Sequence, residues 1–349
     1  MDEQKKKSTY SQAGVDIEAA KEAVEGFKAR VAETFTGGVL SEIGHFGGMY
    51  SLAEARGLDE PVLISSSDGV GTKLMVAQMT GRHDTVGQCL VNHCVNDIMV
   101  QGAKPLFFMD YISVGCLRPE HISEVMTGFI RGCKENEIAL LGGETAEMPG
   151  LYNEDDYDLA GFIVGLADRS RLVTGEKVQE NHVLVGLPST GLHTNGYSLA
   201  RKIIFTDQRL SVSDSLPGGS GETIGEALLA VHRSYKRPLE ALLAAGLLDA
   251  VAHITGGGLT DNLPRVFPKN LDARISLGTW PVPPIFDYLV KTGNVDEQER
   301  YQVFNMGLGM VLIVSRENLD ETARILKGLG EEPRVIGSMA PGQGQVAFI

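Results

Sequence analysis

Residues 66–73 form a run of small, acidic and hydroxyl-bearing side chains, Ser-Ser-Asp-Gly-Val-Gly-Thr-Lys. The run follows the apolar, strand-like segment 61–65 and precedes the helix-like segment 74–79. Backbone N–H groups at the start of a helix bind anions, while Lys73 adds positive charge and Asp68 can hold a metal ion. A Walker A loop is excluded, because it places its lysine directly after a glycine. The junction therefore predicts an α/β chain with a phosphate-binding turn.

The chain has 349 residues, which is long for a single hydrophobic core, so we predict two domains. Strand-like and helical patterns alternate along both halves, which is typical of α/β folds, here of the α+β type. The strand-like runs are 61–67, 106–114, 159–167, 182–187, 250–255, 308–314, 333–339 and 345–349. The helical patterns are 16–35, 84–101, 118–135, 195–206, 222–245 and 317–329. A polar stretch at 168–177 separates the halves, which places the predicted domains at 1–170 and 171–349.

The charge balance argues against a nucleic-acid partner. The chain carries 31 basic and 45 acidic residues, a net charge of −14, and no basic cluster beyond residues 5–7. No apolar run approaches the roughly 20 residues that cross a bilayer, and no apolar segment follows the charged N-terminal residues. The four cysteines form no C-x-x-C pair, which suits a reducing compartment. We expect a cytoplasmic protein that binds no membrane.

The helical pattern at 84–101 is apolar around most of its circumference, which predicts a buried helix. Asn92, His93, Asn96 and Asp97 interrupt it at offsets that place them on one face. Burial of Asp97 without a partner is costly. Two interpretations stay open: a polar stripe paired with neighbouring backbone, or Asp97 and Asn96 facing a metal–phosphate site.

A third acidic position lies in the apolar, glycine-rich segment 140–150, where Glu144 follows two glycines. Together with Asp68 and Asp97 it makes three carboxylates in apolar or glycine-rich surroundings. Mg²⁺ binds carboxylate oxygens together with substrate phosphates. The three acids, with Lys73 beside one of them, favour a Mg-nucleotide site.

Three further glycine-rich turns are candidate ligand contacts. Residues 44–48 can fold over a ligand, and residues 189–197, with His193, offer a hydroxyl-rich anion site at a helix start. Residues 255–261 contain three glycines that let backbone approach a ligand closely. For each of them, a simple structural turn is the alternative.

Several long motifs in a fixed order resemble the phosphoribosylformylglycinamidine cyclo-ligase family, also called the aminoimidazole ribonucleotide synthetases. The similar segments are 10–17, 67–73, 95–97, 100–103, 142–150, 193–199, 255–258 and 304–310. Because they span nearly the whole chain, the chain is identified as a member of this family.

The resemblance implies a two-domain ATP-binding fold whose N-terminal domains pair in a homodimer, with strands of both closing a barrel. It implies ATP-dependent ring closure of formylglycinamidine ribonucleotide to aminoimidazole ribonucleotide in purine biosynthesis, with ATP and Mg²⁺ as cofactors. ATP would phosphorylate the formyl oxygen, and an amidine nitrogen would then attack the activated carbon and expel phosphate.

The same resemblance implies roles for individual residues. Asp68, Asp97 and Glu144 are the expected Mg²⁺ ligands, and the predicted catalytic residues are Asp68, Lys73, His193 and Asn195. The expected nucleotide and substrate contacts are Gly44, Phe46, Gly47, Ser67, Gly69, Gly71, Thr72, Asn96, Thr145, Thr255, Gly256 and Gly257.

Two positions depart from the family pattern. His45 stands in the first glycine-rich loop, where a glycine is more usual, and its role is open. His253 precedes the glycine triplet, where relatives in the superfamily often carry an aspartate. This second departure leaves metal binding by the C-terminal domain open.

Rival interpretations fit the sequence less well. A selenophosphate synthetase needs a reactive residue in an early glycine-rich segment, but no Cys precedes Cys89, and the hydrogenase-maturation relative ends in cysteine rather than Ile349. A thiamine-phosphate kinase is not expected to carry the 142–150 motif, and the related amidotransferase relies on a glutaminase. Proteins of two other classes also fit less well. A non-catalytic nucleotide-binding module has no need of all the acids, and this chain lacks the G-x-G-x-x-G motif of a Rossmann dehydrogenase.

Overall fold

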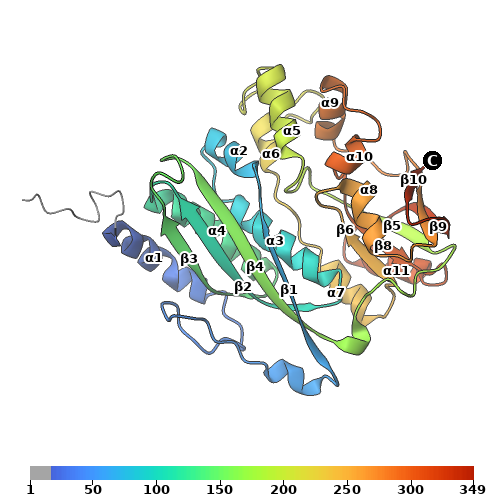
Figure 1. Ribbon diagram of the computed structural model, residues 1–349, viewed down its shortest axis with the longest axis horizontal. Coiled ribbons are helices and arrows are strands. Elements are labelled where there is room, and N and C mark those ends of the chain that lie inside the picture. Colours follow the sequence, from blue (N-terminus) through green and yellow to red (C-terminus); the bar gives the residue numbers. More distant parts are fainter. Residues whose placement is uncertain (1–16) are drawn as a thin grey trace, which may run out of the picture.

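The computed structural model describes residues 17–349, and the chain folds into two units that each contain one β-sheet (Figure 1). The first sheet has four strands and the second has six. The predicted two-domain α/β fold is confirmed. The predicted boundary between residues 170 and 171 lies in the segment that joins the last strand of the first sheet to the first strand of the second.

The N-terminal sheet has the strand order β1-β4-β2-β3. Both β1 (Pro61–Gly69) and β2 (Lys104–Val114) pair antiparallel with β4 (Tyr157–Asp168). In contrast, β3 (Ala139–Glu147) pairs parallel with β2, and such a pair needs a crossover connection, which α4 (Pro119–Glu135) provides.

Helices cover one face of this sheet. The buried helix α3 (Val86–Met99) packs on β1, β2 and β4, and α4 packs on α3 and β3 (Figure 1). The shorter α2 (Lys73–Thr80) follows β1, and α1 (Ile17–Ala32) lies against α4 and the edge strand β3. The core between sheet and helices is apolar, and side chains such as Phe108 and Phe129 are fully buried in it.

The opposite face of the same sheet carries exposed apolar side chains. Met109 on β2 lies directly opposite Phe162 on β4, and both are exposed, as is Leu63 on β1. Side chains alternate between the two faces of a strand, so these residues point away from α3. Large exposed apolar patches of this kind mark interaction surfaces.

The C-terminal sheet has the order β10-β7-β9-β5-β8-β6, and strand β8, between β5 and the edge strand β6, is buried throughout. Its strands are β5 (Val183–Pro188), β6 (Ala250–His253), β7 (Leu271–Ile275), β8 (Leu308–Val314), β9 (Arg334–Pro341) and β10 (Val346–Phe348). Its helices are α5 (Tyr197–Arg201), α6 (Ile224–Leu229), α7 (Lys236–Ala244), α8 (Gly258–Asn262), α9 (Pro284–Thr292), α10 (Arg300–Val303) and α11 (Leu319–Gly328).

Each strand predicted from the sequence is present, but one predicted helix is wrong. The pattern at 222–245 forms two helices, α6 and α7, separated by residues 230–235. The backbone of this short segment pairs with side chains of the N-terminal unit instead of continuing the helix. The sequence also gave no sign of β7 or α9.

No helix among residues 17–349 is long and apolar enough to cross a membrane.

Two glycines bring α3 and α4 close together. A Cβ added at Gly128 would lie 2.7 Å from the carbonyl oxygen of Asp84, and one added at Gly87 would lie 2.5 Å from that of Val125. These neighbours are backbone atoms, which cannot swing aside as a side chain can. The two helices therefore depend on glycine at their crossing.

We expect Gly128→Ala to lower the free energy of unfolding by about 1–3 kcal/mol, because the helices must separate. The matched control is Gly26→Ala on α1, where an added Cβ meets nothing within 4 Å. That change should be neutral or stabilise by up to about 1 kcal/mol through helix propensity. Urea denaturation of both variants measures the difference, and equal stabilities would contradict the close packing.

Candidate active site

The polar stripe of α3 faces residues 230–235 of the C-terminal unit. Asn92 Nδ2 donates to the carbonyl oxygen of His232 at 2.8 Å, and Asn96 Nδ2 donates to that of Arg233 at 3.0 Å. Asn96 Oδ1 accepts the backbone N–H of Tyr235 at 2.9 Å. Both amide side chains are fully buried, so these bonds avoid the cost of unpaired polar groups. The first interpretation of the stripe holds for its amides, which pair with neighbouring backbone, whereas a metal–phosphate site at Asp97 stays a prediction.

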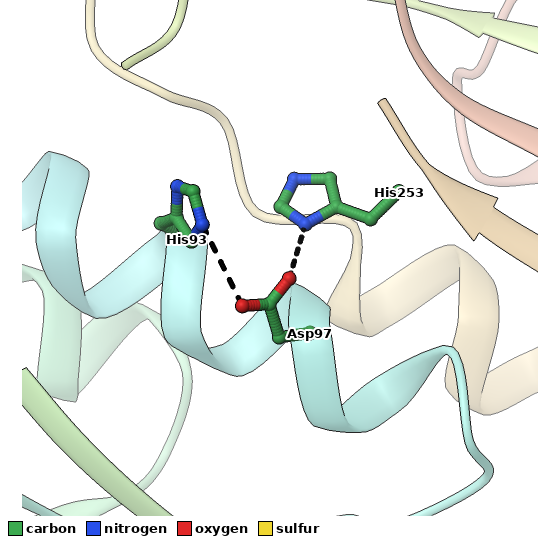
Figure 2. A group of neighbouring side chains, drawn as sticks. All are labelled: His93, Asp97 and His253. Carbon is green, nitrogen blue, oxygen red and sulfur yellow. Dashed lines mark hydrogen bonds and ion pairs between the residues drawn. The ribbon is translucent and has the colours of Figure 1, made fainter. Parts of the chain in front are cut away.

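Two of the predicted carboxylates meet at His93. Asp68, near the end of β1, places its Oδ2 2.7 Å from His93 Nε2, and Asp97 Oδ2 lies 3.5 Å from the same nitrogen. Asp97 Oδ1 lies 2.8 Å from His253 Nδ1 (Figure 2). Ser66 adds a hydroxyl hydrogen bond to Asp97 at 3.1 Å. Asp68 and Asp97 thus belong to one site between the two units.

These contacts keep both acids ionised. Burial works to raise the pKa of Asp68, but the hydrogen bond and charge of His93 outweigh it and lower the pKa below its usual value. Burial opposes ionisation of Asp97 in the same way, and His253 reverses it, so the pKa of Asp97 is also lowered. For His93, burial works to lower the pKa, and the two carboxylates raise it overall.

Further histidines extend the cluster into the C-terminal unit. His253 Nε2 lies 3.0 Å from His232 Nε2, and His193 stacks on His232 with ring centroids 4.0 Å apart. Burial and the neighbouring cationic groups lower the pKa values of His193 and His232 well below normal, so both are neutral. His193 is buried behind His232, and its Nε2 accepts the backbone N–H of Thr190 at 3.1 Å.

The ammonium group of Lys73 is buried rather than open to a ligand. Its Nζ donates to the carbonyl oxygens of His193 at 2.9 Å and Ala230 at 2.6 Å, and it lies 3.2 Å from Cys89 Sγ. Lys73 therefore ties the start of α2 to two segments of the C-terminal unit.

A cavity of about 450 Å³ opens beside Asp68 and His93. It gathers predicted residues from both units, together with His93 and Thr194: Ser67, Asp68, Gly69, Gly71 and Asn195. Thr72 is near its rim, where its hydroxyl lies 3.3 Å from that of Ser198. The turn at Thr255, Gly256 and Gly257 lies close by, because a Cβ at Gly256 would be 3.1 Å from Asn195 Oδ1.

A second cavity of about 620 Å³ lies at the other edge of the sheet, between α1, α4, β2 and β3. It is mostly apolar in its lining and contains the remaining predicted residues, Gly44, Phe46, Gly47, Glu144 and Thr145. The structure thus places Glu144 with the glycine-rich loop and apart from Asp68 and Asp97.

Asp110 is a buried acid on the wall of this second cavity. Burial, with the nearby charge of Glu144, raises its pKa to about 7. Gly143 makes room for it, since a Cβ there would lie 2.3 Å from Asp110 Oδ1. No pattern in the sequence pointed to Asp110 or His232 as members of the site. The polar stripe on the predicted helix was the signal for His93.

Fold and site together define a protein of the AIR-synthase-related class. Residues 54–167 match the family described as AIR synthase related protein, N-terminal domain, and residues 179–349 match its C-terminal domain. Among solved structures, thiamine-monophosphate kinase from Stenotrophomonas maltophilia K279a superposes with a TM-score of 0.69 at 17% identity, covering 93% of this chain and 95% of that one. The hydrogenase maturation protein HypE in complex with ATP gives 0.68 at 15%, covering 95% and 91%. These likenesses show the fold.

Curated relatives narrow the class. Phosphoribosylformylglycinamidine cyclo-ligases from Shouchella clausii (strain KSM-K16) and Bacillus mycoides (strain KBAB4) are each 48% identical to this chain, over 97% and 98% of it and 98% of their own lengths. The enzyme from Alkaliphilus metalliredigens (strain QYMF) is 45% identical over 98% of both chains. The chain belongs to the phosphoribosylformylglycinamidine cyclo-ligase family, and it is a ligase that forms a C–N bond in purine biosynthesis. The resemblance seen in the sequence is confirmed.

We expect Lys73→Met to lower the free energy of unfolding by about 3 kcal/mol, because two buried carbonyl groups lose their donor. Urea denaturation measures this loss. The control is Lys104→Met, which removes an exposed ion pair with Glu54 and should change stability by less than about 1 kcal/mol. A variant of Lys73 with normal stability and no activity would instead place its ammonium on the ligand.

We expect Asp110→Asn to stabilise the protein at alkaline pH. The folded carboxyl has a pKa of about 7 and the unfolded one about 3.9, so folding takes up a proton between these values. The contribution of the Asp110 carboxyl to the free energy of unfolding is fully present below about pH 4 and is lost as the pH rises through about 7. The free energy of unfolding of the variant, relative to that of wild type, should rise by about 2 kcal/mol when the pH is raised from about 5.5 to about 8.5.

Urea denaturation at the two pH values measures this gain. The same measurement on Asp59→Asn, at an exposed acid, is the control. A constant difference between Asp110→Asn and wild type would show that the Asp110 carboxyl titrates normally.

Proposed function

We propose that this chain converts formylglycinamidine ribonucleotide to aminoimidazole ribonucleotide with ATP, in the cavity between β1, α3 and the C-terminal unit. One observation carries the assignment of the site: Asp68, near the end of β1, and Asp97, on α3, are both ionised and both contact His93. The curated relatives that match nearly the whole chain carry the name of this reaction.

The carboxylate oxygens of Asp68 and Asp97 fit Mg²⁺, which prefers carboxylates and keeps room for phosphate oxygens and water. When bound there, Mg²⁺ would neutralise the charge of the phosphates. The turn at Gly71, where β1 gives way to α2, then faces the same phosphates with its backbone, whereas the N–H of Gly69 donates to Asp68 Oδ1 at 2.7 Å.

The chemistry has two steps. The γ-phosphoryl group of ATP moves to the formyl oxygen, which leaves ADP and turns a poor leaving group into phosphate. An amidine nitrogen then attacks the activated carbon, loses its proton and expels the phosphate, closing the ring. Such transfers depend mainly on positioning and charge neutralisation.

The C-terminal unit supplies the substrate side of the cavity. Asn195 lines the cavity and holds the reacting group, and the turn at Thr255, Gly256 and Gly257 binds a phosphate of the substrate through its backbone. His193 is a positioning residue in this scheme, since it is buried behind His232. Lys73 acts in the same way through its bonds to the carbonyl groups of His193 and Ala230.

Glu144 can join Asp68 and Asp97 in one metal site only if it comes from a second chain. One row of the sheet runs from Asp68 through Gly161 and Asp110 to Gly143, the neighbour of Glu144. Three strand spacings separate Asp68 from this edge, about 14 Å. A homodimer that closes both sheets into a barrel sets the β1 edge beside the partner's β3 edge and brings the partner's Glu144 to Asp68.

Two features support this dimer. The barrel would cover the exposed apolar side chains of Leu63, Met109 and Phe162. It would also place the apolar second cavity, with its glycine-rich loop at Gly44, Phe46 and Gly47, where it can hold the nucleotide base while the phosphates reach Asp68.

The direct test incubates the protein with ATP, Mg²⁺ and formylglycinamidine ribonucleotide. The expected result is equimolar ADP, phosphate and aminoimidazole ribonucleotide. Release of ADP without the imidazole product would reject the cyclisation, and no dependence on ATP would reject the ligase mechanism.

Complementation between inactive chains tests the shared site. We expect Asp68→Asn and Glu144→Gln each to abolish most activity alone. Mixed dimers of the two variants keep one intact site, so a 1:1 mixture should regain up to about a quarter of wild-type activity.

The control mixture pairs Asp68→Asn with Asp97→Asn, because both residues contact His93 of the same chain. It should regain nothing. If mixed dimers of the first pair form and stay inactive, Glu144 does not act on the partner's Asp68.

A further inference from the structure

Three potential metal ligands converge where the two units meet. A ring nitrogen of His93, a carboxylate oxygen of Asp97 and a ring nitrogen of His253 all lie within 4.8 Å of one another (Figure 2). His93 and Asp97 lie one turn apart on α3, whereas His253 ends β6. The ligands therefore come from both units.

The spacing suits a tetrahedral ion. His93 Nε2 lies 3.5 Å from Asp97 Oδ2. In a tetrahedral zinc site with bonds of 2.0–2.1 Å, neighbouring ligand atoms are about 3.4 Å apart. The pair has this separation, whereas His253 Nδ1 lies 2.8 Å from the other oxygen, Asp97 Oδ1, so the side chains must move apart for one ion to bind all three.

The close contacts between rings and carboxylates need a proton or a cation between the paired atoms. Two imidazole nitrogens face carboxylate oxygens at 2.7–2.8 Å, in the pairs His93–Asp68 and His253–Asp97. A lone pair on nitrogen and an oxygen anion repel each other at such distances unless a proton or a metal ion lies between them. One divalent ion bound to both rings and to Asp97 satisfies all of these groups at once.

The second nitrogen of each ring is held in the way that metal-binding histidines require. His93 Nδ1 lies 2.7 Å from the hydroxyl of Thr194, and His253 Nε2 lies 3.0 Å from His232 Nε2. Donation through these nitrogens leaves His93 Nε2 and His253 Nδ1 as the free ligand atoms and fixes both ring orientations.

The proposed metal site has a fourth possible ligand and borders a cavity. Asp68 Oδ2 reaches His93 Nε2 and can bind the same ion. Asp68 and His93 line the 450 Å³ cavity, so water or a ligand can reach an ion there.

We propose that His93, Asp97 and His253, with Asp68 as the fourth ligand, bind a divalent transition-metal ion of the Zn²⁺ and Co²⁺ type. Two imidazole nitrogens with carboxylates suit these ions, whereas Mg²⁺ takes oxygen ligands and an octahedral shell. The ion would fasten the two units together and compete with Mg²⁺ for Asp68 and Asp97. The site stands whether or not the proposed reaction is correct.

The experiment uses the full chain, treated with a chelator and then titrated with Co²⁺. The expected result is one ion per chain, the strong visible absorption of tetrahedral Co²⁺, and a Tm raised by several degrees. A weak octahedral spectrum, or binding that Mg²⁺ displaces at equal concentration, would overturn the proposal.

Three variants identify the ligands. His93→Asn and His253→Asn should each weaken Co²⁺ binding at least about tenfold and remove the tetrahedral absorption. His121→Asn is the matched control, since His121 stacks on His83 and takes no part in the cluster, and it should bind like wild type. Unchanged binding by His253→Asn would reject the site.

A second measurement does not depend on the folding of the variants. Proton NMR of the wild-type Co²⁺ complex should show two strongly shifted, exchangeable imidazole N–H signals, one from each bound ring. Their absence from a stoichiometric Co²⁺ complex would place the ion elsewhere.

Discussion

The pairing of two buried amides on α3 with the backbone at 230–235 is the contact on which the rest of the site depends. Asn92 and Asn96 are fully buried, and each must find partners. An extended segment offers free N–H and C=O groups that a helix would have used internally. This explains why α6 ends before α7 begins, and the same extended segment carries His232 over α3, next to His253.

This contact changes the role of the turn at residues 66–73. The sequence suggested that its acid, glycines and lysine all face one anion. In the structure, Asp68 and the glycines face the cavity, while Lys73 turns inward and holds carbonyl groups of the C-terminal unit. The turn therefore has two roles, because its glycines and acid line the cavity and its lysine holds the C-terminal unit against the N-terminal unit.

The features that depend on periodic patterns or motifs along the chain could be predicted from the sequence. The hydrophobic periodicity of the sequence predicted α3 with its polar stripe, and it predicted most of the strands. The long motifs predicted the family. The meeting of His93 with His253 could not be predicted, since it depends on how two domains dock across residues far apart in the sequence. The separation of Glu144 from Asp68 was equally hidden, because the strand order of a sheet does not follow the chain order.

A histidine at position 253 has a physical advantage over a third acid. Asp68, which is exposed, and the half-buried Asp97 already share one site, and another carboxylate there would add repulsion whenever no cation is bound. A neutral imidazole adds no charge, and its N–H can still stabilise Asp97 by a hydrogen bond. The fold can therefore keep both acids ionised through hydrogen bonds from its own histidines.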